Sequence, residues 1–243
     1  NRAGVILLPG IMGSNLSVKE GSERNRVWLD KLDIVRGRGR WLSLDSTRPV
    51  VPDSVLDSPY ERFRDDLVDH SIHVMPMPYD WRLSLEQAAD QLRVLVDARL
   101  TASDAPLHLM AHSMGGLVSS LYINKHPESW ARLRERGGRL VQAGTPNRGS
   151  YSIPRIFSGD EQVLKMIALL DLRNDIKDWL TWISRFPGLL QMAPMTDGPD
   201  FSRVQTWRKL GARVPPSSSD MRQAEQIRQE LTAQSDMLAS GGV

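Results

Sequence analysis

Residues 107–117 read Leu-His-Leu-Met-Ala-His-Ser-Met-Gly-Gly-Leu, and this stretch decides the fold of the chain. An apolar run of strand character ends at Ala111, and a helical pattern begins at Gly115. Ser113 therefore lies at the apex of a sharp turn between a strand and a helix. Such a turn brings strand and helix so close that only small residues fit two positions before and after the apex. Ala111 and Gly115 meet that demand.

A serine between small residues at this spacing fits the Gly-x-Ser-x-Gly nucleophile elbow of α/β-hydrolases, with Ala111 in place of the first glycine. Strain at the apex would expose the Ser113 hydroxyl above the sheet, so Ser113 is the candidate nucleophile. A chance match is the alternative, and the flanking strand and helix favour the elbow. We expect His112 to pack or to shape the substrate site, because a residue next to the nucleophile cannot easily fold back onto its hydroxyl.

The composition indicates one large, soluble α/β domain, with 243 residues of which 40% are hydrophobic and 25% charged. A net charge of +2 gives no reason to expect a nucleic-acid partner. The chain has no cysteine, which excludes disulfides, thiol catalysis and cysteine-ligated metals. We expect no metal and no cofactor. The oligomeric state is left open.

No apolar run approaches the ~20 residues of a membrane span, and no signal peptide is visible. Together with the absence of cysteine, this weakly favours a cytoplasmic location over the alternatives. The chain begins at Asn1 and enters a strand directly, so we expect it to be a fragment or a processed piece. A targeting segment would then be missing.

Apolar runs and helical patterns alternate along the first part of the chain. The predicted strands cover residues 4–8, 72–75, 107–111 and 140–143. The predicted helices cover residues 58–70, which begin with Ser58 and Pro59, residues 85–100 behind a capping box of Ser84 and Gln87, and residues 114–125. This alternation predicts a mostly parallel sheet with helices on both faces and a ligand site at the carboxyl ends of the strands.

The rest of the chain divides by pattern. Residues 15–52 look irregular, and their basic run at residues 36–40 is either a contact for anionic lipid or, as we favour, a solvated loop. Residues 1–150 form the expected hydrolase core, and residues 151–214 a helical cap or lid region. The apolar helical stretch at 151–194 fits a lid over an acyl-chain substrate and plain core packing about equally. Residues 215–243 read as a linker and an amphipathic helix carrying Met221, Ala224, Ile227, Leu231 and Leu238.

The turn Pro9-Gly-Ile-Met-Gly-Ser14 follows the first predicted strand. Glycines let backbone N–H groups approach a ligand closely. In α/β-hydrolases, the loop after an early strand supplies one N–H of the oxyanion hole, and the residue after the nucleophile supplies the other. By position these are Ile11 and Met114. An ordinary turn is the alternative reading of the glycines.

Four ordered motifs within residues 3–150 resemble the lecithin:cholesterol acyltransferase-like family, which includes lysosomal phospholipase A2 and bacterial members. They are Val5-Ile-Leu-Leu-Pro-Gly-Ile-Met-Gly-Ser-Asn-Leu16, Pro78-Tyr-Asp-Trp-Arg82, Ala111-His-Ser-Met-Gly-Gly116 and Gly144-Thr-Pro146. The resemblance implies an α/β-hydrolase fold and acyl transfer from a lipid ester to water or an alcohol. It implies that Ser113 is the nucleophile and that Ile11 and Met114 form the oxyanion hole. Asp80, Trp81 and His112 would lie near the substrate, and transient contact with a membrane surface would follow from a lipid substrate.

The departure from this pattern concerns the partners of the serine. A serine hydroxyl needs a base and an orienting acid, which follow it in the order Asp or Glu, then His. The five histidines are His70, His73, His108, His112 and His126, so none follows residue 126. The later acids that we considered, without choosing one, are Asp171, Asp175, Asp178, Asp197 and Asp200.

We therefore expect the chain to be truncated before the last strands, with the triad acid and histidine beyond Val243. A base supplied by a partner chain is one alternative. Another is a non-catalytic lipid- or partner-binding module on a degenerate hydrolase scaffold. A third reading keeps the fold and the chemistry but changes the substrate, for example to a lipid anchor that is removed from a protein.

Overall fold

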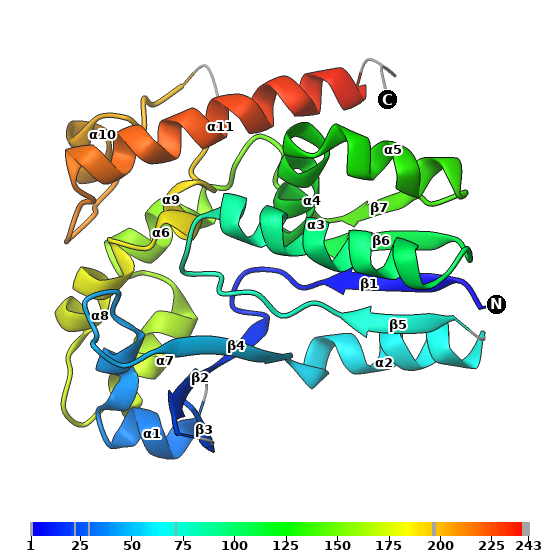
Figure 1. The fold of residues 1–243 in the computed structure, drawn as a ribbon. Coiled ribbons are helices and arrows are strands. Elements are labelled where there is room, and N and C mark those ends of the chain that lie inside the picture. Colours follow the sequence, from blue (N-terminus) through cyan, green and yellow to red (C-terminus); the bar gives the residue numbers. More distant parts are fainter. Residues whose placement is uncertain (1, 22, 29, 71, 196–197, 240–243) are drawn as a thin grey trace.

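The computed structural model describes the chain except for residues 1, 22, 29, 71, 196–197 and 240–243 (Figure 1). Its strands are β1 (Gly4–Leu8), β2 (Ser14–Glu20), β3 (Glu23–Arg26), β4 (Val50–Val55), β5 (His73–Pro76), β6 (Leu107–His112) and β7 (Leu140–Ala143). Its helices are α1 (Lys31–Val35), the 3-10 helix η1 (Arg38–Leu42), α2 (Asp57–Asp69), α3 (Leu85–Ala102), α4 (Met114–Lys125), α5 (Pro127–Glu135), α6 (Ser152–Ser158), α7 (Gln162–Leu170), α8 (Ile176–Ile183), α9 (Pro187–Leu190), α10 (Val204–Lys209) and α11 (Ser218–Ala239). Among the described residues, no helix combines the length and the apolar character needed to cross a membrane.

Four strands form a parallel sheet in the order β5-β1-β6-β7. β1 is buried at every position, as expected for an apolar strand covered on both faces. Helices α3, α4 and α5 pack against one another over this sheet, and α2 lies beside β5 (Figure 1). The predicted parallel sheet with flanking helices is therefore confirmed.

The predicted boundaries agree closely with the observed ones. The observed bounds of β1 and β7 and the end of α4 at Lys125 are the predicted ones. Strand β6 extends one residue beyond its predicted end, to His112. Ser58 keeps an extended backbone (ψ 122°) just before the regular part of α2, as the expected start of that helix requires. Ser84 caps α3 through the Glu86 N–H, but its further side-chain contact is with Gln191 rather than with Gln87.

Residues 15–52 are not irregular, and this prediction was wrong. β2 pairs with β3 and β4 in a three-stranded antiparallel sheet, and α1 and η1 lie between β3 and β4 in the chain. The buried residues Leu16 and Val18 alternate along β2, but polar neighbours surround them and hide the pattern. Proline is rare inside strands, so Pro52 counted against a strand when only the sequence was considered. In the structure Pro52 lies where the pairing of β2 and β4 shifts register, which is a position that tolerates proline.

Helices α6, α7, α8 and α9 follow β7, and the described residues between 151 and 194 contain no strand, as predicted. α11 already begins at Ser218, inside the stretch expected to be a linker, and crosses α4 and α9 (Figure 1). Its residues Met221, Ala224, Ile227 and Leu231 are buried, and the side chain of Leu238 lies outside the described part. The division into core, cap and linker remains a prediction.

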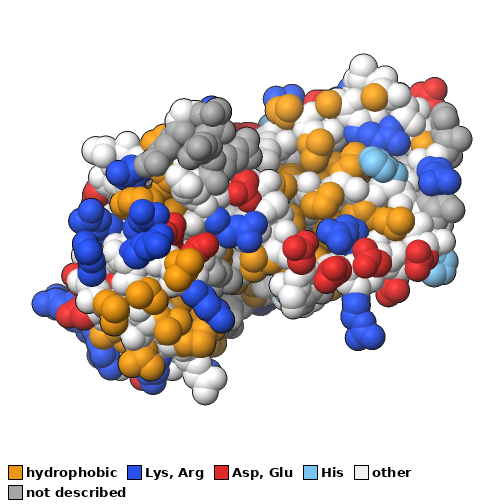
Figure 2. Space-filling view, turned by 90° about the horizontal axis from the view of Figure 1, so that it is seen from below, with side chains coloured by type: hydrophobic (Ala, Val, Ile, Leu, Met, Phe, Trp, Pro, Cys, Tyr) orange, Lys and Arg blue, Asp and Glu red, His pale blue; other side chains and the backbone are white. Residues whose placement is uncertain are grey.

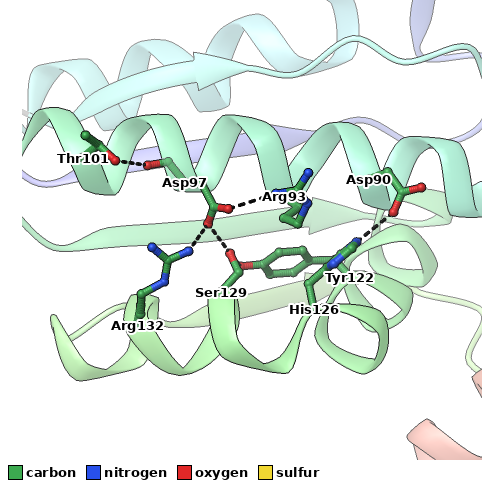
Figure 3. A network of polar contacts seen from close by, with 8 residues as sticks. All are labelled: Asp90, Arg93, Asp97, Thr101, Tyr122, His126, Ser129 and Arg132. Carbon is green, nitrogen blue, oxygen red and sulfur yellow. Dashed lines mark hydrogen bonds and ion pairs between the residues drawn. The ribbon is translucent and has the colours of Figure 1, made fainter.

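Helix α5 was not predicted, because most of its residues are polar and only Ser129, Trp130 and Leu133 are buried. A polar network holds it against α3 and α4 (Figure 3). The Ser129 hydroxyl donates to Asp97 of α3 at 2.6 Å and contacts the Tyr122 hydroxyl of α4 at 2.9 Å. Burial raises the pKa of Tyr122 to about 12, so the phenol stays neutral up to alkaline pH.

This network predicts an alkaline loss of stability. Above pH 10 an unfolded tyrosine begins to lose its proton, whereas folded Tyr122 keeps it up to about pH 12. The folded state then binds more protons, so the free energy of unfolding falls by about 1.4 kcal/mol per pH unit in this window and is unaffected below it. We predict that Tyr122→Phe is less stable at neutral pH but loses stability less steeply between pH 10 and 12. Urea unfolding across this pH range measures both slopes, and equal slopes would contradict the prediction.

Candidate functional site

Ser113 joins β6 directly to α4, with φ +51° and ψ −119°. A positive φ is rare for residues other than glycine and costs on the order of 1–3 kcal/mol. Met12 is the one other non-glycine residue in the described part of the chain that adopts it. The Ser113 N–H donates to the Ala143 carbonyl of β7 at 2.8 Å, which ties the turn to the neighbouring strand. The predicted strand, sharp turn and helix are therefore present.

The small residues around the turn meet a steric limit. A Cβ atom on Gly115 would lie 2.7 Å from the Pro9 carbonyl oxygen and 2.8 Å from that of Leu8. Ala111, two residues before the serine, is fully buried. The first turn of α4 thus packs directly on the backbone at the end of β1, and a side chain at Gly115 would force them apart.

Residues 9–14 follow β1 and pass beside Ser113. A Cβ atom on Gly10 would lie 3.1 Å from the Ser113 Cβ. Two tyrosines fix the first half of this loop: the Tyr79 hydroxyl donates to the Pro9 carbonyl at 2.7 Å, and the Gly10 N–H donates to the Tyr60 hydroxyl at 2.7 Å. Burial raises the pKa of both phenols, so they remain neutral.

Two tryptophans fix the second half of the loop. The Trp28 indole N–H donates to the Met12 carbonyl at 3.0 Å, and the Trp81 indole N–H donates to the Ser14 carbonyl at 3.3 Å. The two rings also meet edge to face, with centroids 4.8 Å apart. Both indoles are buried, so this half of the loop is held by buried side chains.

Two backbone donors near Ser113 are free of protein acceptors. Within the residues that the structure describes, the N–H groups of Ile11 and Met114 donate to no protein oxygen. Met114 is the first residue of α4, where an N–H has no acceptor within the helix and the helix dipole is positive. Ile11 follows Gly10, which touches Ser113. Two such donors can stabilise a negatively charged oxygen beside the serine.

His112 is exposed, and its ring is held by Tyr60. The distance between its Nδ1 atom and the Tyr60 hydroxyl is 2.8 Å. The same hydroxyl accepts from the Gly10 N–H, so Tyr60 links His112 to the loop at residues 9–14. The Nδ1 atom is thereby occupied by Tyr60 rather than by Ser113.

The structure brings no histidine–carboxylate pair to Ser113 within the described residues. His126 does bind the carboxylate of Asp90 at 2.8 Å (Figure 3), but it follows the last residue of α4. At ~1.5 Å per residue, this places it roughly 20 Å along the helix from Ser113. His70 contacts the carbonyl of Asp66, away from the turn.

The later acids that are described have structural contacts. Asp171 accepts from backbone N–H groups of its own turn and from the Trp179 indole at 3.1 Å. Asp175 and Asp178 form the capping box of α8. Asp200 accepts from Ser202, whose hydroxyl lowers the pKa of that carboxyl. Asp197 lies outside the described residues. Among those that are described, no group of three or more His, Asp or Glu side chains is arranged to hold a metal.

Asp80 and Trp81 follow β5 but have different surroundings. Asp80 forms a buried ion pair with Arg82, at 2.6 Å between carboxylate and guanidinium. Arg82 also donates to the Leu42 carbonyl at 2.6 Å and so connects the loop to η1. Trp81, in contrast, lines a cavity that a substrate could enter, whereas the Asp80 carboxylate is engaged by Arg82. Direct contact with a substrate stays a prediction for both residues.

That cavity has a volume of about 200 Å³ and is almost wholly apolar. Its walls are Met12, Trp28, Leu42, Trp81, Ser152, Ile156, Glu161, Val163, Leu164, Ile167, Trp179, Ile183 and Phe186. Met12 belongs to the loop beside Ser113, and the opposite walls come from α6, α7 and α8. The sequence showed these helices to be apolar but gave no sign that they enclose a cavity together with Trp28, Trp81 and Leu42 of η1.

The contact at Gly115 gives a stability prediction. We expect Gly115→Ala to lower the free energy of unfolding by about 1–3 kcal/mol, because its methyl group would overlap the backbone at the end of β1. Urea unfolding should show a lower midpoint with an unchanged slope. The control is Gly137→Asn, which puts a side chain into open space at a positive φ that asparagine tolerates. Equal stability of the two variants would contradict the steric argument.

The chain is similar to known proteins. A family model described as lecithin:cholesterol acyltransferase matches residues 69–200, which is more than half of the chain. The match contains the Tyr79–Arg82 block and the serine turn, begins after the loop at 9–14, and extends into the helices that follow β7.

Curated relatives match about half of the chain or somewhat more. Rat phosphatidylcholine-sterol acyltransferase is 31% identical over 118 residues, which are 47% of this chain and 26% of the relative. Dog lysosomal phospholipase A and acyltransferase is 27% identical over 154 residues, which are 60% of this chain and 37% of the relative. The chain thus spans between about a quarter and two fifths of the length of these relatives.

A solved structure supports the fold. A chain of the Tle4–Tli4 complex superposes with a TM-score of 0.54 and 16% identity, covering 96% of this chain and 72% of that chain. At this identity the likeness shows the fold alone. Together with the parallel sheet and its helices, it confirms the predicted α/β-hydrolase fold.

Proposed function

The chain belongs to the lecithin:cholesterol acyltransferase family, and from this premise we propose that it is a serine-dependent lipid esterase or O-acyltransferase. One observation carries the proposal. Ser113 occupies a strained turn next to two backbone N–H groups, of Ile11 and Met114, that have no protein acceptor among the described residues. A strained serine with free donors beside it is the arrangement that acyl transfer needs.

In the proposed reaction the Ser113 hydroxyl oxygen attacks the carbonyl carbon of a lipid ester, and a general base takes the hydroxyl proton. The carbonyl oxygen becomes an oxyanion that accepts from the Ile11 and Met114 N–H groups. One such donor contributes roughly 2.7–4 kcal/mol in a measured protease. The leaving alcohol takes a proton as the acyl-serine forms, and water or a second alcohol then releases the acyl group.

The general base is not assigned. His112 has its Nδ1 atom bound to Tyr60, and His126 lies at the far end of α4. We therefore propose that the acid and base act from residues that the structure does not place beside Ser113.

The apolar cavity supports an acyl substrate. Met12, next to the donor residue Ile11, forms part of its wall, and we propose that an acyl chain attached at Ser113 enters this apolar space. A cavity of about 150 Å³ accommodates benzene, so a volume of about 200 Å³ corresponds to roughly eight carbon atoms. We propose that this space holds the carbonyl-proximal part of the chain.

The missing base also supports a second candidate function, a lipid-binding module without turnover. It shares the cavity with the first candidate and differs in chemistry. Lipid binding in the full-length protein without any covalent labelling of Ser113 would favour it.

We predict that a fluorophosphonate probe labels the full-length protein at Ser113 and that Ser113→Ala abolishes this labelling. Ester turnover should fall by roughly four orders of magnitude or more, because the covalent step is lost. The matched control is Ser119→Ala, also in α4, whose buried hydroxyl donates to the Gly115 carbonyl. Mass spectrometry of the labelled peptide identifies the site, and a label that persists in Ser113→Ala would refute the assignment.

A further inference from the structure

The hydroxyl of Tyr60 lies between the two segments that supply the proposed oxyanion hole. On one side it accepts from the Gly10 N–H at 2.7 Å, in the loop at residues 9–14. On the other side it lies 2.8 Å from Nδ1 of His112, the residue before Ser113. The rings of Tyr60 and His112 also meet edge to face, with centroids 5.7 Å apart. A single side chain thus connects the loop to the serine turn.

The start of helix α2 places Tyr60 beside the loop. Strand β4 pairs with β2, and the Leu56 N–H that follows β4 donates to the Gly13 carbonyl at 2.9 Å. The chain therefore enters α2 at the end of the loop. Tyr60 lies in the first turns of this helix and reaches back to the beginning of the loop, at Gly10.

The rest of α2 is a surface helix. Tyr60 is buried, whereas Glu61, Arg62, Asp65 and Asp66 are exposed. Figure 2 shows the molecule from the side on which α2 lies, with acidic and basic side chains gathered on that part of the surface. Burial raises the pKa of the Tyr60 phenol, so its hydroxyl stays neutral. A neutral hydroxyl can accept one hydrogen bond and take part in a second.

The peptide group between Gly10 and Ile11 is held on two sides. Its carbonyl, which belongs to Gly10, accepts from the Gly13 N–H at 3.0 Å. The preceding N–H, also of Gly10, is held by Tyr60. Because a peptide group is planar and its carbonyl and N–H point in opposite directions, these two bonds determine where the Ile11 N–H points. That N–H is one of the two proposed oxyanion donors.

The contacts around this peptide leave it little room to move. A Cβ atom on Gly13 would lie 2.9 Å from the Gly10 carbonyl oxygen and 3.2 Å from the Tyr60 hydroxyl. A Cβ atom on Gly10 would lie 2.9 Å from Nδ1 of His112. Loop, phenol and imidazole are thus in close contact, so a change at the hydroxyl is passed to the peptide that carries the donor.

We propose that Tyr60 is a positioning residue of the oxyanion hole, whose hydroxyl aligns the Ile11 N–H with the Met114 N–H. The Met114 donor is part of α4 and is fixed to Ser113, whereas the Ile11 donor is part of the loop. Two donors stabilise one oxygen only when both lie within hydrogen-bond distance of it. The inference rests on the proposed function for its chemistry but not for the orientation of the Ile11 amide.

Tyr60→Phe keeps the ring and removes the hydroxyl. In the full-length protein, kcat for p-nitrophenyl butyrate should fall about 10- to 100-fold with an unchanged KM, because a misplaced donor affects the oxyanion and not the bound ester. The affinity for a trifluoromethyl ketone, which forms a similar oxyanion on a serine, should fall by the same factor.

The matched control is Tyr122→Phe, which removes a buried hydroxyl at the other end of α4 from Ser113. It should lower the stability to urea and leave both kcat and the ketone affinity unchanged. If Tyr60→Phe behaves in the same way, the Tyr60 hydroxyl only stabilises the fold, and the positioning proposal is overturned.

A double-mutant cycle tests the connection through His112. His112→Leu removes the contact at Nδ1 and should lower kcat for the same ester. The double variant Tyr60→Phe/His112→Leu should lose about as much as Tyr60→Phe alone, because both changes break the same contact. Losses that multiply would show two side chains acting independently and would contradict the proposal.

The orientation of the donor can also be followed without turnover. The amide NMR signal of Ile11 should shift in Tyr60→Phe and stay in place in Tyr122→Phe. If the protein shows neither labelling nor turnover while this signal shifts, the proposed function fails and the role of Tyr60 in orienting the amide stands. If labelling and turnover are present while Tyr60→Phe changes neither kcat nor the signal, the proposed function stands and the positioning proposal fails.

Discussion

The contact between Gly115 and the backbone at the end of β1 is the constraint on which the site depends. Because only a hydrogen atom fits there, the first turn of α4 rests on the carbonyl oxygens of Leu8 and Pro9. The connection from β6 is then so short that Ser113 must adopt a positive φ. The same approach puts the start of α4 beside residues 9–14, so a hydroxyl and two backbone donors gather in one place.

Much of this arrangement can be predicted from sequence because it depends on local steric rules. Small residues around Ser113 predict the turn, and the fully apolar run of β1 predicts a strand covered on both faces. The glycines of residues 9–14 predict a loop whose backbone can approach a ligand. Each of these signals lies within about ten residues of the feature it predicts.

The features that escaped prediction depend on contacts between distant segments. Tyr60 and Tyr79 hold the loop at Pro9 and Gly10 from 50 and 70 residues away, and nothing in their local sequence indicates it. The antiparallel sheet was hidden because polar residues flank Leu16 and Val18. The walls of the cavity come from segments that are far apart in the sequence, from Met12 to residues 152–186. The partners of Ser113 could not be found either, since His112, His126 and the described later acids have other contacts.

The most direct test of the central claim is a crystal structure of the full-length protein after reaction with an alkyl fluorophosphonate of about eight carbons. We predict phosphorus bonded to the Ser113 oxygen and a phosphonyl oxygen about 3 Å from the Ile11 and Met114 nitrogens. The alkyl chain should lie in the cavity between Met12 and Trp81. Phosphorus on another residue, or a phosphonyl oxygen directed away from both nitrogens, would contradict the account.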